Sequence, residues 1–288
     1  MDIFLQVGIN GLTIGLLYVL MALGLTLIFG VMDVINFAHG EFYMLGAFFT
    51  YIATVKLQMS FFISLSLAVL IVAILAIFIE RIVFRPLIEN PLNVLIVSLA
   101  VSIFLQHIAQ LSFGPDNYKI PSPAPGVFVL GDLYFPKERL FAAGVSILFL
   151  FGLYLIIFHT KFGRAMRAVA QDPESAALQG VKISRIYMLS FSLGCGLAAA
   201  AGGLIGPIFS ANAFMGTMAV VKAFVVIILA GLGSIRGAVI GGLVLGVVES
   251  FGATFLGTQY CDMMGFALIM LVLIVKPSGL FGTAVEKA

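Results

Sequence analysis

A tight group of polar side chains interrupts the first long apolar stretch of this chain. Asn36, His39 and Glu41 belong to the polar run Asp33–Glu41, which glycines flank on both sides. Irregular backbone at membrane depth is tolerated where it is buried in protein or lines a cavity. The free N–H groups of a broken helix can bind the carboxylate of a small zwitterion. An ordinary cytoplasmic turn explains the same polarity equally well, so both interpretations stay open.

Further polar side chains lie inside other apolar runs. Gln106 and Gln110 are four residues apart, so they share one face of a helix and could line a polar cavity. Glu249 lies near the middle of its run, where a charged side chain costs about 2.5–3.5 kcal/mol on insertion scales. Lys222 lies near the end of another run and could reach the interface alone; an ion pair with Glu249 is the alternative. Candidate pathway residues are therefore Asn36, His39, Glu41, Gln106, Gln110 and Glu249.

A basic segment between two apolar runs is the third chemical feature. Residues 161–185 read KFGRAMRAVAQDPESAALQGVKISR and contain five Lys or Arg residues. Asp172 and Pro173 are typical of the N-cap and first position of a helix, and Gly180 is typical of the residue beyond a helix end. The pattern predicts a short, capped helix that can transmit force from a soluble partner.

The sequence contains no recognisable catalytic or cofactor motif. HExxH, GxSxG and the GxxxxGK[ST] phosphate loop are all absent, and the two cysteines match no metal or redox spacing. A net charge of +2 gives no strong basic field for nucleic acid. We expect no enzyme activity, no cofactor, no metal and no nucleic-acid partner, and any driving nucleotide would bind another chain.

Composition predicts the elements that position these residues. The chain is 62% hydrophobic and only 10% charged, whereas soluble domains average about 25% charged residues. The predicted fold is an all-α, polytopic membrane helical bundle, because about 20 apolar residues cross a bilayer as a helix. Candidate spans cover roughly 5–29, 40–56, 61–83, 92–112, 140–158, 187–206, 218–233, 238–256 and 262–275. The last is short and residues 30–40 are ambiguous, so we expect eight or nine crossings.

Positive charges orient the predicted bundle. With alternating spans, ten Lys and Arg residues fall on one side and four on the other, with Lys222 inside a span. The positive-inside rule makes the richer side cytoplasmic, which places the segment 161–186 there and the segment 113–139 outside. Nine crossings would leave the N-terminus outside. The outer segment is rich in proline and glycine and suits either an ordered cap or a docking surface for a receptor.

Several blocks of the sequence resemble one family. NGLTIGLLYVLMALGLTLIFGVMDVINFAHGEFYMLGAF resembles the opening of the LivH-type permease of bacterial branched-chain amino acid ABC importers. The likeness continues in ERIVFRPL, RAMRAVAQDPESAALQGV, AGLGSIRGAVIGGLVLGVVE and KPSGLFG, so it covers nearly the whole chain. INFAHGEFYMLGA is its most specific block.

The resemblance implies a working unit with several partners. Residues 1–288 would form a single permease domain in a bacterial inner membrane. A second, LivM-like permease, two ABC ATPase subunits and an extracytoplasmic amino-acid-binding protein would complete the importer. Such permeases dock on the ATPase through an EAAxxxG motif, and here ESAALQG departs from it only at Ser175. The candidate coupling residues are Asp172, Glu174, Ala176, Ala177 and Gly180.

Two other functions remain open from the residues. A relative that moves urea or short amides would carry similar blocks. An ion-coupled secondary transporter would instead need membrane carboxylates, of which Glu249 is nearly the only candidate, and it would not need the segment 161–186 to dock on an ATPase.

Overall fold

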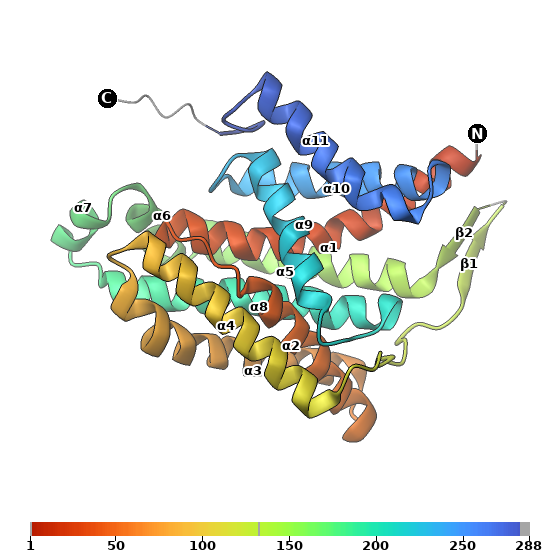
Figure 1. The fold of residues 1–288 in the computed structure, drawn as a ribbon, viewed down its shortest axis with the longest axis horizontal. Coiled ribbons are helices and arrows are strands. Elements are labelled where there is room, and N and C mark those ends of the chain that lie inside the picture. The colour runs from red at the N-terminus through yellow and green to blue at the C-terminus, as the bar shows by residue number, and fades with distance from the viewer. Residues whose placement is uncertain (1, 132, 283–288) are drawn as a thin grey trace.

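The computed structural model describes residues 2–131 and 133–282, which form a bundle of long helices with one small hairpin (Figure 1). The elements are α1 Asp2–Met32, α2 His39–Tyr51, η1 Ile52–Lys56, α3 Phe61–Ile79, η2 Glu80–Phe84, η3 Arg85–Leu87, α4 Pro91–Phe113, β1 Val127–Leu130, β2 Leu133–Pro136, α5 Lys137–His159, α6 Lys161–Gln171, α7 Pro173–Leu178, α8 Ile183–Phe209, α9 Met215–Ala230, α10 Ile235–Phe255, η4 Thr258–Tyr260 and α11 Cys261–Val275. The helical bundle is as predicted, and the antiparallel pair β1–β2 is the one addition within the described ranges. Lys287, counted among the cytoplasmic charges, lies outside the described residues.

The predicted number of crossings is too high. Within the described residues, seven helices are long and apolar enough to cross a membrane: Ile3–Met32, Phe61–Leu87, Pro91–Phe113, Lys137–His159, Ile183–Phe209, Ile235–Phe255 and Thr258–Val275. The expected spans 40–56 and 218–233 correspond to α2 and α9, whose α-helical parts have 13 and 16 residues. At 1.5 Å per residue, 16 residues extend about 24 Å, short of the roughly 30 Å hydrocarbon core.

Two helices form the centre of the bundle. In the most apolar windows of α1 and α8, 72% and 83% of the residues are buried, against 12% in the last candidate span. Both central helices are apolar on all sides, as expected for helices surrounded by protein. The more exposed α3, α4, α5 and α11 form the periphery, where side chains such as Leu70, Phe104 and Leu148 are exposed.

Glycines let the central helices approach through their backbones. A Cβ atom on Gly46 of α2 would lie 2.2 Å from the Ala199 carbonyl oxygen of α8. One on Gly246 of α10 would lie 2.4 Å from the Cα of Gly15 in α1. Small residues allow such close packing where lipid provides no hydrophobic driving force between helices. Gly46 and Gly246 therefore lie at direct backbone contacts between α2 and α8 and between α10 and α1.

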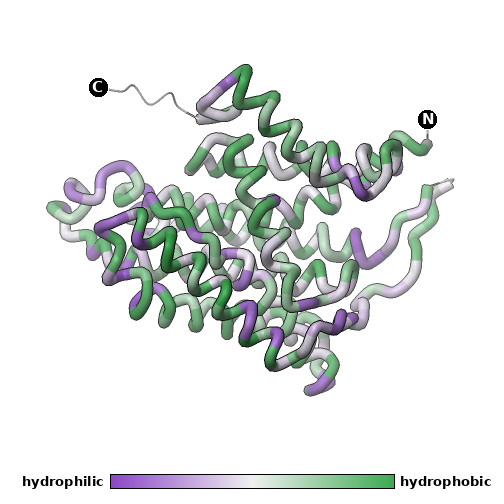
Figure 2. Tube along the Cα trace, viewed as in Figure 1, coloured by the Kyte–Doolittle hydropathy of each residue, from purple (hydrophilic) through white to green (hydrophobic). Residues whose placement is uncertain are grey.

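The two ends of the bundle differ in character. α6 and α7 project at one end, and the hairpin β1–β2 lies at the opposite end (Figure 1). Hydrophilic residues gather around α6 and α7, whereas the middle of the long helices is mostly hydrophobic (Figure 2). At the hairpin end, the Gln6 side chain donates to the Tyr134 carbonyl at 3.1 Å, and Tyr118 pairs with Ala211 through two backbone hydrogen bonds. Tyr118 and Tyr134 therefore join the segment 113–139 to the residues after α8 and to α1.

Candidate functional site

The helix α7 is capped at both ends as the sequence predicted. Asp172 is its N-cap, and one carboxylate oxygen accepts the backbone N–H groups of Glu174 and Ser175 at 3.0 and 3.1 Å. Pro173 occupies the first helical position. A hydrogen bond from the Ser175 hydroxyl, together with these backbone N–H groups, lowers the pKa of Asp172 below its ordinary value. The start of α7 is therefore fixed by local hydrogen bonds.

The end of α7 is a Schellman motif. The Gly180 N–H donates to the Ala177 carbonyl at 2.9 Å, and the Val181 N–H donates to the Ala176 carbonyl at 3.1 Å. Gly180 has φ +81°, a backbone conformation in which a side chain would be strained. These bonds close the C-terminal end of α7, and α8 begins soon after it in the chain, at Ile183.

One face of α7 is presented to solvent. Glu174, Ala177 and Leu178 are exposed, and the i, i+3, i+4 spacing places them on the same face, while Ala176 is buried. The side chain of Leu178 is 88% exposed in the most polar part of the chain. We name Glu174, Ala177 and Leu178 the α7 face.

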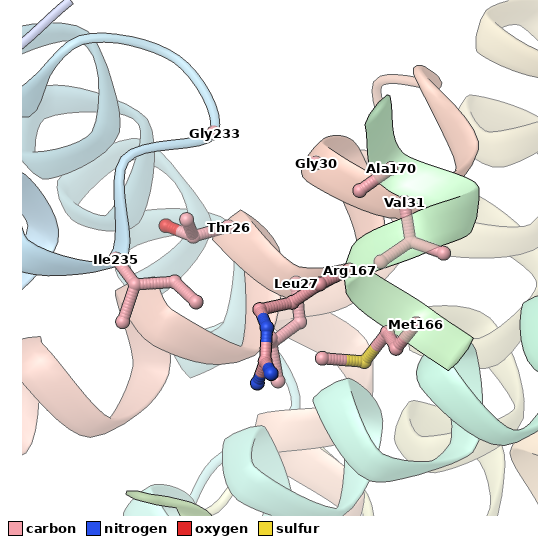
Figure 3. A pocket seen from close by; sticks show the side chains of 9 residues that line it. All are labelled: Thr26, Leu27, Gly30, Val31, Met166, Arg167, Ala170, Gly233 and Ile235. Atoms are coloured by element: carbon pink, nitrogen blue, oxygen red, sulfur yellow. The ribbon is translucent and has the colours of Figure 1, made fainter. Parts of the chain in front are cut away.

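The helix α6 fixes this end to the membrane bundle (Figure 3). Its Arg167 side chain turns inward, where the guanidinium donates to the Ile157 carbonyl of α5 and lies 5.2 Å from the Phe158 ring centroid. Arg167 also lines a small cavity of about 60 Å³ between α6, the last turns of α1 and the start of α10. Arg167 is one of the ten Lys and Arg residues on the predicted cytoplasmic side, and its side chain joins α6 to α5.

The polar group that opened the sequence analysis is a break between two helices. α1 ends at Met32, residues 33–38 are not helical, and α2 begins at His39. Asn36, His39 and Glu41 are 0%, 0% and 1% exposed, whereas Asp33 at the start of the break is exposed. The irregular backbone around Asn36 therefore lies where it is tolerated, inside protein.

Each buried side chain at the break has at least one partner. Asn36 accepts the Ala38 N–H at 3.0 Å, and Glu41 accepts the Ser102 hydroxyl of α4 at 3.0 Å. The His39 ring nitrogen Nε2 lies 3.1 Å from the Met21 carbonyl of α1, so it must donate its proton there. These contacts hold α2 against its neighbours.

A much larger cavity, of about 760 Å³, lies in the half of the bundle nearer the hairpin. Its walls come from the first half of α1, the last turns of α8, the first half of α9 and the second half of α10. Glu249 of α10 lines it and forms a 2.6 Å ion pair with Lys222 of α9. The Tyr18 hydroxyl of α1 donates to the other Glu249 oxygen at 2.7 Å. Three helices therefore meet at one carboxylate.

The structure brings together only some of the predicted pathway residues. Glu249 lines the large cavity, whereas Asn36, His39 and Glu41 are buried at the α1–α2 break outside its lining. Gln106 donates to the Thr217 hydroxyl at 3.0 Å, and neither it nor Gln110 lines this cavity. The six candidate pathway residues therefore do not form one site. Asn36, His39 and Glu41 lie at the break. Gln106 joins α4 to α9, and of the six only Glu249 lines the large cavity.

Sequence reasoning missed several residues. Tyr18 is 231 positions from Glu249, and no periodicity in the sequence indicates their contact. Glu80 is fully buried, and Arg85 binds it at 2.7 Å while also donating to the Ser184 carbonyl of α8 at 3.0 Å. A carboxylate and an arginine five residues apart, at the end of an apolar run, were the available signal for that pair. Leu178 carried no signal beyond its polar surroundings.

The chain matches the family described as branched-chain amino acid transport system / permease component, over residues 8–274. The chain belongs to this permease family. Its relatives include the high-affinity branched-chain amino acid transport system permease protein BraD of Pseudomonas aeruginosa, 39% identical over 97% of this chain and 96% of that protein. LivH of Escherichia coli K12 is 37% identical over 97% and 96%. The probable LivH of Methanocaldococcus jannaschii is 30% identical over 94% and 90%.

Family membership decides the class of protein. The resemblance found in the sequence is confirmed over nearly the full length of the permease. The permease is a multi-pass membrane protein and a transport component rather than an enzyme.

Proposed function

We propose that this chain is a permease subunit of an ATP-driven importer for branched-chain amino acids in the inner membrane. It would form half of the translocation pathway beside a second, LivM-like permease. Two separate ATPase subunits would bind its cytoplasmic end, and an amino-acid-binding protein would deliver the substrate to the hairpin end. Membership of the permease family and the names of its relatives support this proposal.

The α7 face is the observation that carries the proposal. α7 is short, exposed and capped at both ends, by Asp172 and by the Schellman bonds of Gly180 and Val181, and it lies directly before α8 in the chain. An ATPase that binds Glu174, Ala177 and Leu178 would hold α7 as a rigid element, because a helix capped at both ends moves as a unit. Burial of the exposed Leu178 side chain would favour the complex.

The helix α8 extends from the residues after α7 to the wall of the large cavity. Its 27 residues extend about 40 Å, from the end of the bundle that carries α7 to Ile205 and Phe209 in the cavity wall. Glycine contacts lock it to α1 and α2, so a displacement of α7 moves several helices together. ATP binding would change the side to which the cavity opens only through contacts that differ between the two states.

Uptake by the reconstituted importer tests the substrate. Proteoliposomes would contain this permease, its partner permease and the ATPase, with the binding protein and labelled leucine, urea or acetamide outside. We expect ATP-dependent uptake of leucine and none of the other two solutes. Uptake of urea or acetamide would assign the chain to the amide-transporting relatives instead, and uptake without ATPase subunits would indicate a secondary transporter.

Substitutions on α7 test the coupling. We expect Glu174→Lys and Gly180→Val to reduce leucine uptake at least fivefold while ATP hydrolysis continues, because the first alters the α7 face and the second strains its C-terminal cap. Glu89→Lys is the matched control for charge, since Glu89 is an exposed residue in the short link before α4. Gly144→Val is the control for glycine, since nothing lies within 4 Å of a Cβ there.

The readouts are uptake and ATP hydrolysis measured in the same proteoliposomes. Undiminished uptake in both α7 variants, with normal insertion, would contradict a coupling role for α7.

A further inference from the structure

Among the described residues that line the large cavity, two side chains form a pair of opposite charges. Lys222 and Glu249 lie 2.6 Å apart, and both line the cavity. The Lys222 ammonium also lies 5.3 Å from the centroid of the Tyr18 ring, within range of a cation–π contact. Tyr18 in turn donates its hydroxyl proton to Glu249. The three side chains form one polar cluster on three different helices, and we name it the charge cluster.

The surroundings of the charge cluster are mostly apolar. Side chains of Ile14, Leu17, Met21, Met215 and Met218 line the same cavity. Methionine is flexible and adapts to ligands of irregular shape. The cavity therefore combines charged groups of both signs with a wall suited to an aliphatic chain.

The ion pair is partly buried, with the Lys222 and Glu249 side chains 21% and 9% exposed, and its cost is one that a structural role alone leaves unexplained. Removing two charges from water is expensive, and apolar residues of similar volume are often as stabilising as the pair. Within a membrane bundle, ionisable residues that face a cavity mark substrate pathways more often than packing sites. Lys222 and Glu249 together carry no net charge. They can therefore exchange their mutual contact for contacts with a zwitterion, which also carries no net charge, so that each charge keeps a partner.

We propose that the charge cluster is a binding site for the zwitterionic head group of an α-amino acid. The Lys222 ammonium binds the substrate carboxylate, Glu249 and Tyr18 bind the substrate ammonium, and the aliphatic side chain lies against the apolar wall. Each protein charge exchanges its present partner for the matching charge of the ligand. This inference rests on the proposed function and assigns its substrate to particular residues.

Arg139 is the other formally charged side chain among the described residues that line the cavity. It lies in the first turn of α5, directly after β2, at the hairpin end of the bundle. A positive side chain at that end attracts the carboxylate of an incoming zwitterion toward Lys222. The cavity therefore favours ligands that carry a carboxylate.

Binding to the purified permease–ATPase complex, without the binding protein, tests the site directly. Labelled L-leucine at millimolar concentration is the probe, with leucinamide and 4-methylpentanoate as competitors that each lack one charge. We expect both analogues to compete at least tenfold more weakly than L-leucine. We expect Lys222→Gln to weaken L-leucine binding at least tenfold and Glu249→Gln to do the same.

Two control variants remove charge near the same end without lining the cavity. Lys137→Gln is the match for Lys222→Gln, and Glu138→Gln is the match for Glu249→Gln. Both should bind L-leucine as the wild type does. Assembly with the ATPase, measured by co-purification, separates loss of the site from loss of the fold.

The reversed pair, Lys222→Glu with Glu249→Lys, gives the sharpest outcome. It keeps an ion pair, so the bundle should still assemble. The positions of the ammonium and carboxylate sites are exchanged while the apolar wall stays in place. Exchange of two substituents on a tetrahedral carbon inverts its handedness, so the reversed variant should bind D-leucine at least tenfold better than L-leucine.

Each outcome supports or overturns the inference. Unchanged L-leucine binding in Lys222→Gln and Glu249→Gln, equal competition by the two analogues, or no L-leucine binding to the wild-type complex would overturn it. A reversed pair that still prefers L-leucine would show that the ion pair only ties α9 to α10. If the importer takes up leucine normally despite any of these results, the proposed function stands and only this site is wrong. If the wild-type importer takes up no amino acid, the proposed function itself is wrong.

Discussion

Asp172 fixes the start of α7 through its own carboxylate, so the state of one side chain controls how well that helix is held. Three hydrogen bonds end on this group, from the Ser175 hydroxyl and the N–H groups of Glu174 and Ser175. Their combined effect lowers the pKa of Asp172. Because the folded pKa is lowered, the cap stabilises α7 fully above the ordinary carboxyl value of about 3.9 and loses that effect as the pH falls through the folded value.

We therefore expect coupled uptake to be insensitive to Asp172 titration between pH 8 and pH 5. Asp172→Ala should reduce the ratio of leucine uptake to ATP hydrolysis several-fold, because the N-cap is lost. Asp172→Asn should retain most of it, because an asparagine oxygen also accepts the backbone N–H groups. The measurement is that ratio at pH 8, 6.5 and 5. A decline in the wild type above pH 5 that disappears in Asp172→Asn would contradict the lowered pKa.

At the residue scale, predictability depended on how far apart the partners are in the sequence. The caps of α7 were predicted because Asp172 and Gly180 bond to residues at most four positions away. The ion pair of Lys222 and Glu249 was one of two open alternatives, because it depends on how α9 packs against α10. Tyr18 was not predicted at all, since its contact with Glu249 exists only once α1 and α10 are packed together.

At the scale of helices, the glycine contacts are the feature that positions both functional surfaces. α2 and α8 touch through the backbone at Gly46 and Ala199, and α1 and α8 touch at Gly24 and Gly194. The sequence does not show which helices these glycines join. It also overestimated the number of full spans, because α9 has only 16 residues and the helical stretch 39–56 of α2 and η1 is not among the helices long and apolar enough to cross a membrane.

We expect Gly46→Ala to destabilise the permease by about 1–3 kcal/mol, because the added methyl group has no room beside the Ala199 carbonyl. Gly144→Ala in α5 is the matched control, since a Cβ there meets nothing within 4 Å. It should stabilise the helix by about 0.5–1 kcal/mol. The thermal unfolding midpoints of the purified variants provide the measurement, and equal midpoints for the two would contradict the close packing of α2 on α8.

At the scale of the whole molecule, the two ends differ in composition and in structure. The end with α6 and α7 is hydrophilic and the opposite end carries the hairpin (Figures 1 and 2). The positive-inside rule places the first in the cytoplasm. The family was predictable because its sequence blocks extend over nearly the entire chain. The hairpin β1–β2 was not predicted, since proline and glycine in 113–139 suited a cap or a docking surface without indicating strands.

Epitope insertion tests this orientation. A tag inserted after Gly131, at the turn between β1 and β2, should be accessible to antibody on intact spheroplasts. A tag inserted after Gln179, beyond α7, should become accessible only after the membrane is permeabilised. The reverse pattern would show that the charge bias assigns the wrong side, and it would remove α7 from reach of a cytoplasmic ATPase.

The contrast in size between the two described cavities bears on how the cell keeps its ion gradients. The cavity near α6 holds about 60 Å³, enough for only a few water molecules, whereas the one near the hairpin holds about 760 Å³. Within the described part of the chain, the two share no lining residue. A permease that keeps these two cavities separate during transport would import a nutrient without opening a continuous water path for protons or sodium ions.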